Sequence, residues 1–362
     1  MNSQPLISPN RSRPPRVLIV RIGAMGDVLH AMPAVAALRQ RHPDWFIGWA
    51  IDPCWRELLQ ANMTAQRGAA MPLVDRCYTV PTREWKRQPV SLETLSSIRA
   101  VRRELRGEQF DLCVDMQGSI RSSMIGWMAG AEKFAGPADP REQPARWMYG
   151  EKIPMSAAHV IEQGCELLGA AVGELLTPTK VELPTDEAAE TWRNELLSQV
   201  APEGKKFALI APSAGWGAKQ WPAERYGAAA AALAEAGYVP LVNAVFTGDI
   251  LANAVVDASG GTAVVVPCSV GQLIALTRQA SLVVAGDTGP LHLAAALERP
   301  VVALFGPTDP ARNGPYGTAS RVLRHASSKK DHTRHAAPEE GLMQITADEV
   351  IAAAFDLLQP TR

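Results

Sequence analysis

The sequence predicts an α/β fold with parallel sheets, organised as two domains. Short apolar runs typical of buried strands alternate with longer segments typical of helices along most of the 362 residues. The length exceeds what one hydrophobic core usually serves, and this favours two domains. One strand in each half leads through a glycine-bearing turn directly into a helix, and open α/β sheets bind ligands at such turns.

The predicted elements follow in a regular order. A proline-flanked stretch, 177–185, is the predicted hinge between the domains. The tail over 346–358 is predicted to be an amphipathic helix with Thr346 as its N-cap. Strands are expected over 16–21, 46–51, 76–80, 111–115, 207–212, 238–243, 262–266, 281–285 and 301–305. Helices are expected over 28–41, 91–106, 121–129, 158–172, 186–199, 223–236, 270–279 and 290–297.

Composition narrows the class of protein. Apolar residues make up 47% of the chain and charged residues 20%, which is typical of a soluble globular protein. No apolar run reaches the ~18 residues of a membrane span. Residues 1–15 are polar and rich in Pro and Arg, so we expect a disordered arm rather than a signal peptide. The five cysteines are scattered without metal-ligand spacing, which indicates reduced thiols in the cytoplasm.

Charge is divided unevenly between the two halves. Residues 1–150 hold 20 Lys and Arg against 14 Asp and Glu, a net charge of +6, whereas the remainder holds 16 against 23, a net charge of −7. The first half therefore favours an anionic partner. Arg83, Lys86 and Arg87 follow a strand-like run and a proline, so we expect them in a loop at a strand end, where they suit phosphate or carboxylate. The alternative is that they only solvate the surface.

The turn over 286–289, Gly-Asp-Thr-Gly, joins an apolar strand to the helical run that begins at Pro290. Such a turn aims free backbone N–H groups and the positive end of a helix dipole at one point, which is most often a phosphate site. Gly286 and Gly289 let the backbone approach a ligand closely. The alternative is an N-cap turn without a ligand.

The turn over 22–27 in the first half is of the same kind. It lacks both the G-x-G-x-x-G pattern and the Walker lysine, which excludes the dinucleotide and P-loop fingerprints. It does offer the carboxylate of Asp27 at the mouth of a sheet, where open α/β sheets bind ligands. The alternative is that Asp27 only caps the following helix.

Four motifs, taken together and in order, carry a resemblance to a known family. They are 17–30, 115–118, 219–222, and 286–289 with His292, the last followed by 305–310. They resemble glycosyltransferase family nine, the bacterial ADP-heptose:lipopolysaccharide heptosyltransferases. The resemblance implies the GT-B fold, in which two Rossmann-like domains face each other and the last helix returns to the first domain. The implied parts are a disordered arm (1–15), an acceptor-binding domain (16–183), a nucleotide-sugar-binding domain (184–345) and the C-terminal helix (346–362).

The resemblance also implies a reaction, the inverting transfer of heptose from ADP-heptose to the Kdo/lipid A inner core of lipopolysaccharide. In this reaction Asp27 is the catalytic base, and Lys219 neutralises the departing diphosphate together with the start of the helix after Gly289. The sequence shows no D-x-D motif and no His/Cys cluster, so no metal and no other cofactor is expected. The expected donor-binding residues are Ser213, Ala214, Lys219, Asp249, Cys268, Asp287, Thr288, Gly289 and His292.

Some donor-side positions depart from the family pattern or stay open. Asp249 stands where the family has a glutamate near the ribose, and it follows a bulky Val-Phe pair. Cys268 lies where the family places an adenine-lining loop, with a helix N-cap at Ser269 as the alternative. His292 is expected either to contact phosphate or sugar or to be satisfied locally.

The expected acceptor site lies in the first half. Its basic residues are expected to bind Kdo carboxylates and lipid A phosphates. Tyr149 resembles a family position that faces the acceptor. Trp85 and Trp127 could touch an acyl or sugar surface, but for Trp127 a place in the core is expected. The expected acceptor-binding residues are Arg21, Met25, Gly26, Arg83, Lys86, Arg87, Gln117, Arg121 and Arg141.

Three functions remain open at this point. The first is a first-heptose transferase, the second a family member with another donor or acceptor, such as a second-heptose transferase. The third is a nucleotide-binding module without transfer activity, which Asp27, Lys219 and Asp287 together speak against. The expected partners are a nucleotide sugar, an anionic lipid-linked Kdo acceptor and, peripherally, the cytoplasmic face of the inner membrane, with no nucleic acid.

Overall fold

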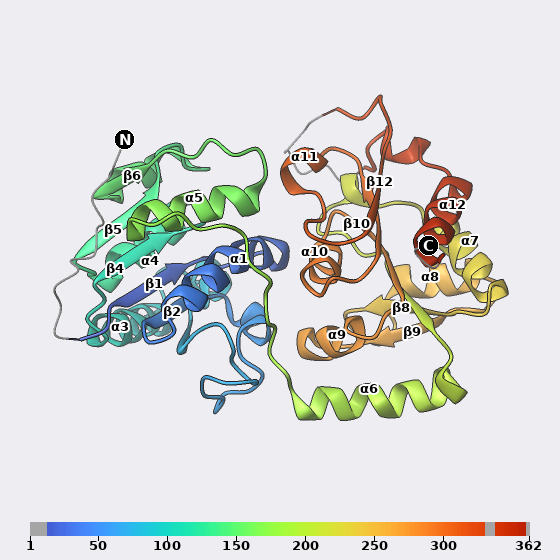
Figure 1. Ribbon diagram of the computed structural model, residues 1–362, viewed down its shortest axis with the longest axis horizontal. Helices are drawn as coiled ribbons and strands as arrows, with labels where there is room; N and C mark the ends of the chain where they lie inside the picture. The colour runs from blue at the N-terminus through green and yellow to red at the C-terminus, as the bar shows by residue number, and fades with distance from the viewer. Residues whose placement is uncertain (1–12, 330–336, 360–362) are drawn as a thin grey trace. The chain divides into compact units, whose positions relative to one another are not determined.

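The computed structural model describes residues 13–329 and 337–359, and the chain divides between Thr185 and Asp186 into two units (Figure 1). Each unit is built on its own six-stranded sheet, in which every pairing is parallel. The strand order is β3-β2-β1-β4-β5-β6 in the first unit and β12-β11-β10-β7-β8-β9 in the second. The predicted class, α/β with parallel sheets, is confirmed. Residues 1–12 of the predicted arm lie outside the described residues.

The elements of the first unit alternate as predicted, with two additional strands at one edge. The strands are β1 (Arg16–Val20), β2 (Phe46–Ile51), β3 (Arg76–Thr79), β4 (Leu112–Asp115), β5 (Lys133–Pro137) and β6 (Glu151–Ile153). The helices are α1 (Met25–Arg41), η1 (Pro53–Leu58), α2 (Thr82–Arg87), α3 (Leu92–Gly107), α4 (Ile120–Ala129), η2 (Gln143–Met148) and α5 (Val160–Val172).

The second unit begins with α6 (Glu187–Val200). Its strands are β7 (Phe207–Ala211), β8 (Val239–Ala244), β9 (Val264–Pro267), β10 (Leu282–Gly286), β11 (Val301–Phe305) and β12 (Ser320–Arg324). Its other helices are η3 (Pro202–Gly204), η4 (Gly217–Lys219), α7 (Ala223–Glu235), α8 (Ile250–Ala258), α9 (Val270–Thr277), α10 (Gly289–Ala296), α11 (Pro310–Asn313), η5 (Leu342–Gln344) and α12 (Ala347–Leu358).

The strand order places a topological switch point in each sheet, and this is what positions the candidate site. In the first unit β1 and β4 are neighbours, and Val20 is in register with Asp115, so the loops after these strands leave the sheet at the same edge. In the second unit β7 and β10 are neighbours, and Ala211 is in register with Ala285. Ligands of doubly wound sheets bind at this crevice, where the chain leaves two adjacent strands in opposite directions.

The core of each unit follows from strands that are buried on both faces. Every residue of β7, β10 and β11 is buried, which explains why these segments consist almost entirely of apolar residues. The strands that the sequence analysis missed are β5, β6 and β12. They lie towards or at a sheet edge, and their sequences carry charged residues or Gly and Pro in place of an apolar run.

The last helix, α12, belongs to the second unit. It packs on α7 and on strands β10, β11 and β12. The physical reason is its apolar face, because Val350 and Ala354 join the buried cluster around Trp221 and Tyr226. The indole N–H of Trp221 donates to the carbonyl of Ile345 at 3.0 Å, which fixes the segment that leads into the helix. Residues 360–362 lie outside the described residues.

Helix α4 contradicts an expectation. Trp127 was expected in the core, yet 60% of its surface is exposed. The buried side of α4 is instead made of small residues and Ile125, which pack over β4 and β5. No helix within the described ranges is both long and apolar enough to cross a membrane.

Candidate active site

Asp27 lies in the first turn of α1, held by the loop that leaves β1. Its Oδ1 lies 3.0 Å from the Arg21 Nη2 in an ion pair, and its Oδ2 accepts a hydrogen bond from the backbone N–H of Ala24 at 3.2 Å. Arg21 is itself fixed, because its guanidinium also donates to the backbone carbonyls of Asp27 and Met116. The carboxylate therefore has one defined orientation, and its side chain remains 37% exposed and within reach of a substrate hydroxyl.

The loop after β4 meets the loop after β1 through Gln117. Its Oε1 accepts the backbone N–H of Ile22 at 2.8 Å, so the two loops of the switch point are joined directly. Gly118 has φ +70°, and a Cβ there would lie 3.1 Å from the backbone nitrogen of Arg141. Only glycine suits this left-handed position with so little space. The structure thus brings Arg21, Asp27 and Gln117 together.

Asp115, the last residue of β4, holds that loop in place through hydrogen bonds. The sequence analysis did not single it out as a site residue. It is fully buried, and it accepts hydrogen bonds from the backbone of Gln117 and Gly118 and from the hydroxyls of Ser122 and Tyr149. Burial raises the pKa of Asp115, although these hydrogen bonds oppose the shift. The expectation that Tyr149 faces the acceptor is therefore wrong, because the side chain is buried and its hydroxyl donates to Asp115 at 2.7 Å.

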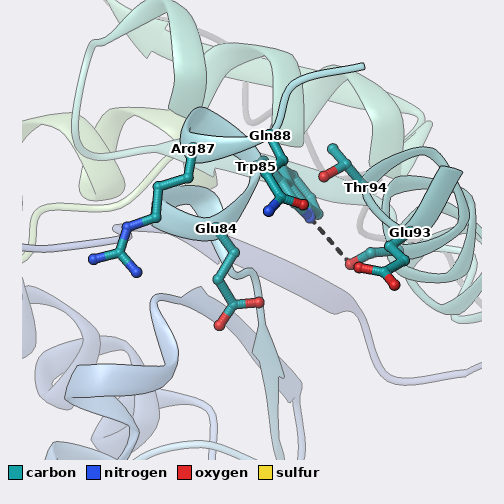
Figure 2. A pocket seen from close by; sticks show the side chains of 7 residues that line it. Glu84, Trp85, Arg87, Gln88, Glu93 and Thr94 are labelled. Carbon is teal, nitrogen blue, oxygen red and sulfur yellow. Dashed lines mark hydrogen bonds between the residues drawn. The ribbon is translucent and has the colours of Figure 1, made fainter. Parts of the chain in front are cut away.

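The basic cluster of residues 83–87 lies on helix α2 and not in a loop, so that expectation is corrected. The carbonyl of Pro81 accepts the N–H groups of Glu84 and Trp85, which closes the first turn of the helix. A hollow of about 340 Å³ lies between α2 and α3. Figure 2 shows the side chains that line it. Its lining contains charges of both signs and is not a basic pocket. The lining residues are Glu84, Trp85, Arg87, Gln88, Glu93, Thr94 and Ser97.

The remaining acceptor-side residues occupy different settings. Arg83 points toward η1, with Nε 3.6 Å from the Asp52 carboxylate and the guanidinium 5.6 Å from the Trp55 ring. Arg121 reaches the Thr82 hydroxyl at 3.4 Å, which links α4 to α2 beside the switch point. Gly26 is partly exposed, and Lys86, Arg87 and Arg141 are exposed. Met25 is buried, so its side chain is part of the core and the expected contact with an acceptor is not supported.

In the second unit, Lys219 and Asp287 join the two loops of the switch point. Lys219 ends η4 after β7, and its ammonium pairs with the Asp287 carboxylate and donates to the Asp287 carbonyl at 3.3 Å. An ammonium has three N–H donors, so these contacts leave one for a phosphate oxygen. The ring of Trp216 lies 5.1 Å from the Lys219 Nζ, a cation–π arrangement that accounts for the tryptophan in this loop.

Asp287 is the centre of this arrangement. Its Oδ1 lies 3.1 Å from the His292 Nε2, and its Oδ2 accepts the Thr308 hydroxyl at 2.7 Å. Burial alone would raise the pKa of Asp287, but the hydrogen bond and charge of His292, followed by the charge of Lys219, outweigh it and hold that pKa well below its usual range. Asp287 is thus a buried anion that positions its neighbours. Of the two possibilities for His292, the structure shows the local one.

The start of α10 is open to an anion. Thr288 occupies the N-cap position without a side-chain capping bond, because its hydroxyl donates to the Gly286 carbonyl at 3.2 Å. This side chain therefore leaves the first N–H groups of the helix, beginning at Gly289, to a ligand. Gly286 is required by close packing, since a Cβ there would lie 3.2 Å from the carbonyl oxygen of Lys219. The uncapped start of α10 and the Lys219 ammonium thus lie at the same switch point.

The other expected donor residues are spread along the same edge of the sheet. Ser213 and Ala214 follow β7 and are partly exposed. Asp249 caps α8, where its Oδ1 accepts the N–H groups of Leu251 and Ala252 at 3.0 and 3.1 Å, so the carboxylate is already used by the helix. Cys268 accepts a contact from the Asn243 amide at 3.1 Å, and burial raises its pKa to about 12. Ser269 caps α9, as the alternative for this loop foresaw.

We expect Asp287→Asn to lower the free energy of unfolding by about 3 kcal/mol, because it leaves the largely buried Lys219 ammonium without its counter-charge. The pKa of Asp287 is lowered in the folded state, so its contribution is fully present above the ordinary aspartate value of 3.8 and is lost as the pH falls below it. Denaturant unfolding of both proteins across this range measures the difference. The matched control is Asp257→Asn at an exposed position, and a difference that does not shrink in acid contradicts the assignment.

Two Rossmann-like units, each with its functional loops at the switch point, define a glycosyltransferase of the GT-B fold. The family model described as glycosyltransferase family 9 (heptosyltransferase) matches residues 98–343. The chain therefore belongs to glycosyltransferase family 9, and it is an enzyme of the heptosyltransferase class. Among the residues that the structure describes, no group of three or more His, Cys, Asp or Glu side chains is placed to hold a metal ion.

Named relatives and solved structures agree with this assignment. Lipopolysaccharide heptosyltransferase 1 of Escherichia coli K12 is 26% identical over 346 residues, which are 93% of this chain and 98% of the relative. The solved E. coli heptosyltransferase WaaC with ADP has a TM-score of 0.74 at 24% identity, over 94% and 99% of the two chains. Lipooligosaccharide heptosyltransferase 2 of Haemophilus ducreyi is 24% identical over 368 residues, covering 95% of this chain and 99% of the relative.

Proposed function

We propose that this enzyme transfers heptose from ADP-heptose to the Kdo residue of the lipid A inner core, as the first heptose of lipopolysaccharide. The observation that carries the proposal is the Lys219–Asp287 pair beside the open start of α10, a site suited to a nucleoside diphosphate. A relative solved with ADP and with ADP-2-deoxy-2-fluoro heptose supports the choice of donor. The relative named heptosyltransferase 1 supports the first-heptose assignment.

The proposed reaction is a single displacement with inversion. The Asp27 carboxylate accepts the proton of the acceptor hydroxyl as the hydroxyl oxygen forms its bond to the anomeric carbon. The bond from that carbon to the β-phosphate oxygen breaks, and its electron pair leaves with ADP. Lys219 and the first N–H groups of α10 stabilise the charge that develops on the diphosphate. Asp287 keeps Lys219 in place, and Arg21 keeps Asp27 in place. This mechanism uses no metal ion.

A second-heptose transferase is the remaining candidate within the class, because a relative of that name also covers nearly the whole chain. Synthetic acceptors separate the two functions. We expect the enzyme to transfer heptose from ADP-heptose to lipid A that carries Kdo alone. It should not require an acceptor that already carries a first heptose. Parallel assays with UDP- and GDP-sugars test the donor. Activity only on the heptosylated acceptor, or only with another nucleotide, contradicts the proposal.

The anionic acceptor makes a separate prediction for the basic residues of α2. We expect the combined change Arg83→Gln, Lys86→Gln and Arg87→Gln to raise the acceptor KM at least about tenfold at low salt and to leave the donor KM almost unchanged. The effect should fall at high salt, because exposed charges are screened over about 8–10 Å.

Initial rates against acceptor concentration, at two salt concentrations, make this measurement. Replacing Arg99, Arg102 and Arg103 of α3 by Gln gives a control with the same loss of charge. An unchanged acceptor KM in the α2 variant shows that its cations only solvate the surface, and acceptor binding then depends on Arg121 and Arg141.

A further inference from the structure

Helix α4 buries polar side chains and exposes apolar ones, which is the opposite of the usual arrangement in a helix that faces water. Its two serines are buried and satisfied inside the unit, where the Ser122 hydroxyl donates to Asp115 and the Ser123 hydroxyl to the Ile120 carbonyl. Apart from Ile125, its most exposed side chains include three large apolar ones. Ile120, Met124 and Trp127 are 38%, 50% and 60% exposed, and their spacing places them on one stripe of the helix.

The neighbouring helix η2 also exposes a large apolar side chain. It packs beside α4, and the Glu142 carboxylate at its start accepts the N–H of Ile120 at 2.9 Å. On η2, Trp147 is 84% exposed, which is unusual for the largest apolar side chain. Single exposed apolar residues are ordinary, but four of them on two helices packed together form a patch that marks a contact surface. We name Ile120, Met124, Trp127 and Trp147 the α4–η2 surface.

Arginines surround this surface. Arg121 is the only other exposed residue of α4, and Arg141 and Arg146 lie exposed at η2. On the α3 side, the Arg106 Nε donates to the carbonyl of Met128 at 3.2 Å, which places a fourth guanidinium beside α4. Two carboxylates lie at the same helices: Glu142 accepts the N–H of Ile120 at the N-terminus of α4, where the helix dipole offsets its charge, and Asp139 accepts the side-chain amide of Gln143 on η2. The four arginines against these two carboxylates leave a net positive charge.

We propose that the α4–η2 surface docks on the headgroup region of an anionic lipid bilayer. Tryptophan prefers the boundary between headgroups and acyl chains, where its ring is buried and its N–H stays hydrated. Guanidinium groups around such an anchor add attraction to anionic lipid.

The position of the surface deepens the proposed function, on which this inference rests for its biological use. Helix α4 begins directly after the Gln117–Ser119 loop, which meets the loop of Asp27. A bilayer against α4 therefore lies beside the candidate acceptor site. A lipid-linked acceptor would reach Asp27 without leaving its membrane. Docking of this kind accounts for the two exposed tryptophans.

Vesicle co-sedimentation of the full chain tests the proposal without requiring transfer activity. The vesicles contain equal parts of phosphatidylethanolamine and phosphatidylglycerol, with pure phosphatidylcholine vesicles as the uncharged comparison. We expect the wild type to bind the anionic vesicles and to bind the uncharged ones far less. The double variant Trp127→Ser, Trp147→Ser should lose at least about tenfold in partitioning, because membrane affinity scales with the apolar area that is buried.

The matched control is Met63→Ser with Leu175→Ser, two residues of the same unit that are 74% and 80% exposed but lie on neither helix. It should bind vesicles like the wild type. Equal binding by the tryptophan variant and the wild type overturns the proposal, and so does a wild type that ignores anionic vesicles. A dimeric wild type that becomes monomeric only in the tryptophan variant, without vesicle binding, identifies a second copy of the chain as the occupant and also overturns it.

Transfer assays separate this inference from the proposed function. With a water-soluble acceptor that lacks acyl chains, the tryptophan variant should match the wild type in kcat and KM. With the acceptor embedded in anionic vesicles, its KM should rise. Failure of the wild type to transfer heptose to either acceptor contradicts the proposed function, whereas loss of vesicle binding is measured independently of any transfer.

Discussion

Asp27→Asn should lower kcat by about a hundredfold to ten-thousandfold, the usual contribution of a positioned general base. The amide has the same shape and its oxygen still accepts the Ala24 N–H, so α1 keeps its first turn. What it loses is the ability to take the proton of the acceptor hydroxyl. Affinity for ADP should stay within about twofold of the wild type, because the candidate diphosphate site lies in the other unit.

Turnover and ADP affinity have to be measured on the same preparation, so that misfolding is not mistaken for loss of chemistry. Asp44→Asn is the matched control, since it removes an exposed carboxylate of the same unit away from the switch point. Near-wild-type turnover in Asp27→Asn removes Asp27 from the mechanism and leaves it as part of the helix start. Loss of ADP binding together with turnover would show that the substitution acts on the fold.

The ion pair between Asp27 and Arg21 shows which parts of the candidate site can be predicted from the sequence and which cannot. The carboxylate was predicted from a strand followed by a short turn and a helix, and a turn of this kind is fixed by local pattern. The ion pair with Arg21 depends on how the residue directly after β1 projects past the sheet, and no spacing rule gives it. Likewise, the loops of β1 and β4 meet only because these strands are neighbours in the sheet.

The residues that were misjudged share a physical cause, which is that their environment is set by distant segments. Tyr149 was placed at the surface, but the buried charge of Asp115 needs its hydroxyl. Trp127 was placed in the core because tryptophan is usually buried, but the core beneath α4 is filled by smaller residues. The edge strands β6 and β12 carry too few apolar residues to reveal themselves, and they form because a neighbouring strand offers its backbone.

In the second unit, residues were easier to predict where a sequence motif also contains the charged groups that a diphosphate requires. Lys219 and Asp287 were both named for the donor site, and the structure brings them into contact. Thr308 was part of a recognised motif, yet its hydrogen bond to Asp287 could be seen only in three dimensions. Asp287 was expected to bind the donor itself; in the structure its carboxylate is buried and is paired with Lys219 and His292.

Lys219→Ala should weaken both donor binding and turnover, with kcat falling by about a hundredfold to a thousandfold, as when one preorganised donor to a developing anion is removed. The loss in kcat should exceed the loss in ADP affinity, because charge on the diphosphate increases as the glycosidic bond breaks. Lys219→Arg keeps the positive charge, and Asp287 keeps a partner, so it serves as the control for the stability of the pair.

Metal dependence is decided in the same experiment. If Lys219 and the start of α10 carry the diphosphate charge, wild-type turnover should persist in EDTA and should not rise with added Mg²⁺ or Mn²⁺. Abolition by EDTA with rescue by either ion would assign the leaving-group charge to a metal. The Lys219→Ala variant adds a second comparison. If Mg²⁺ restores turnover in that variant but does not raise wild-type turnover, an added cation replaces the ammonium only where the side chain has been removed. Wild-type kinetics in Lys219→Ala, with or without metal, would exclude the lysine from leaving-group stabilisation and leave that charge to the N–H groups of α10.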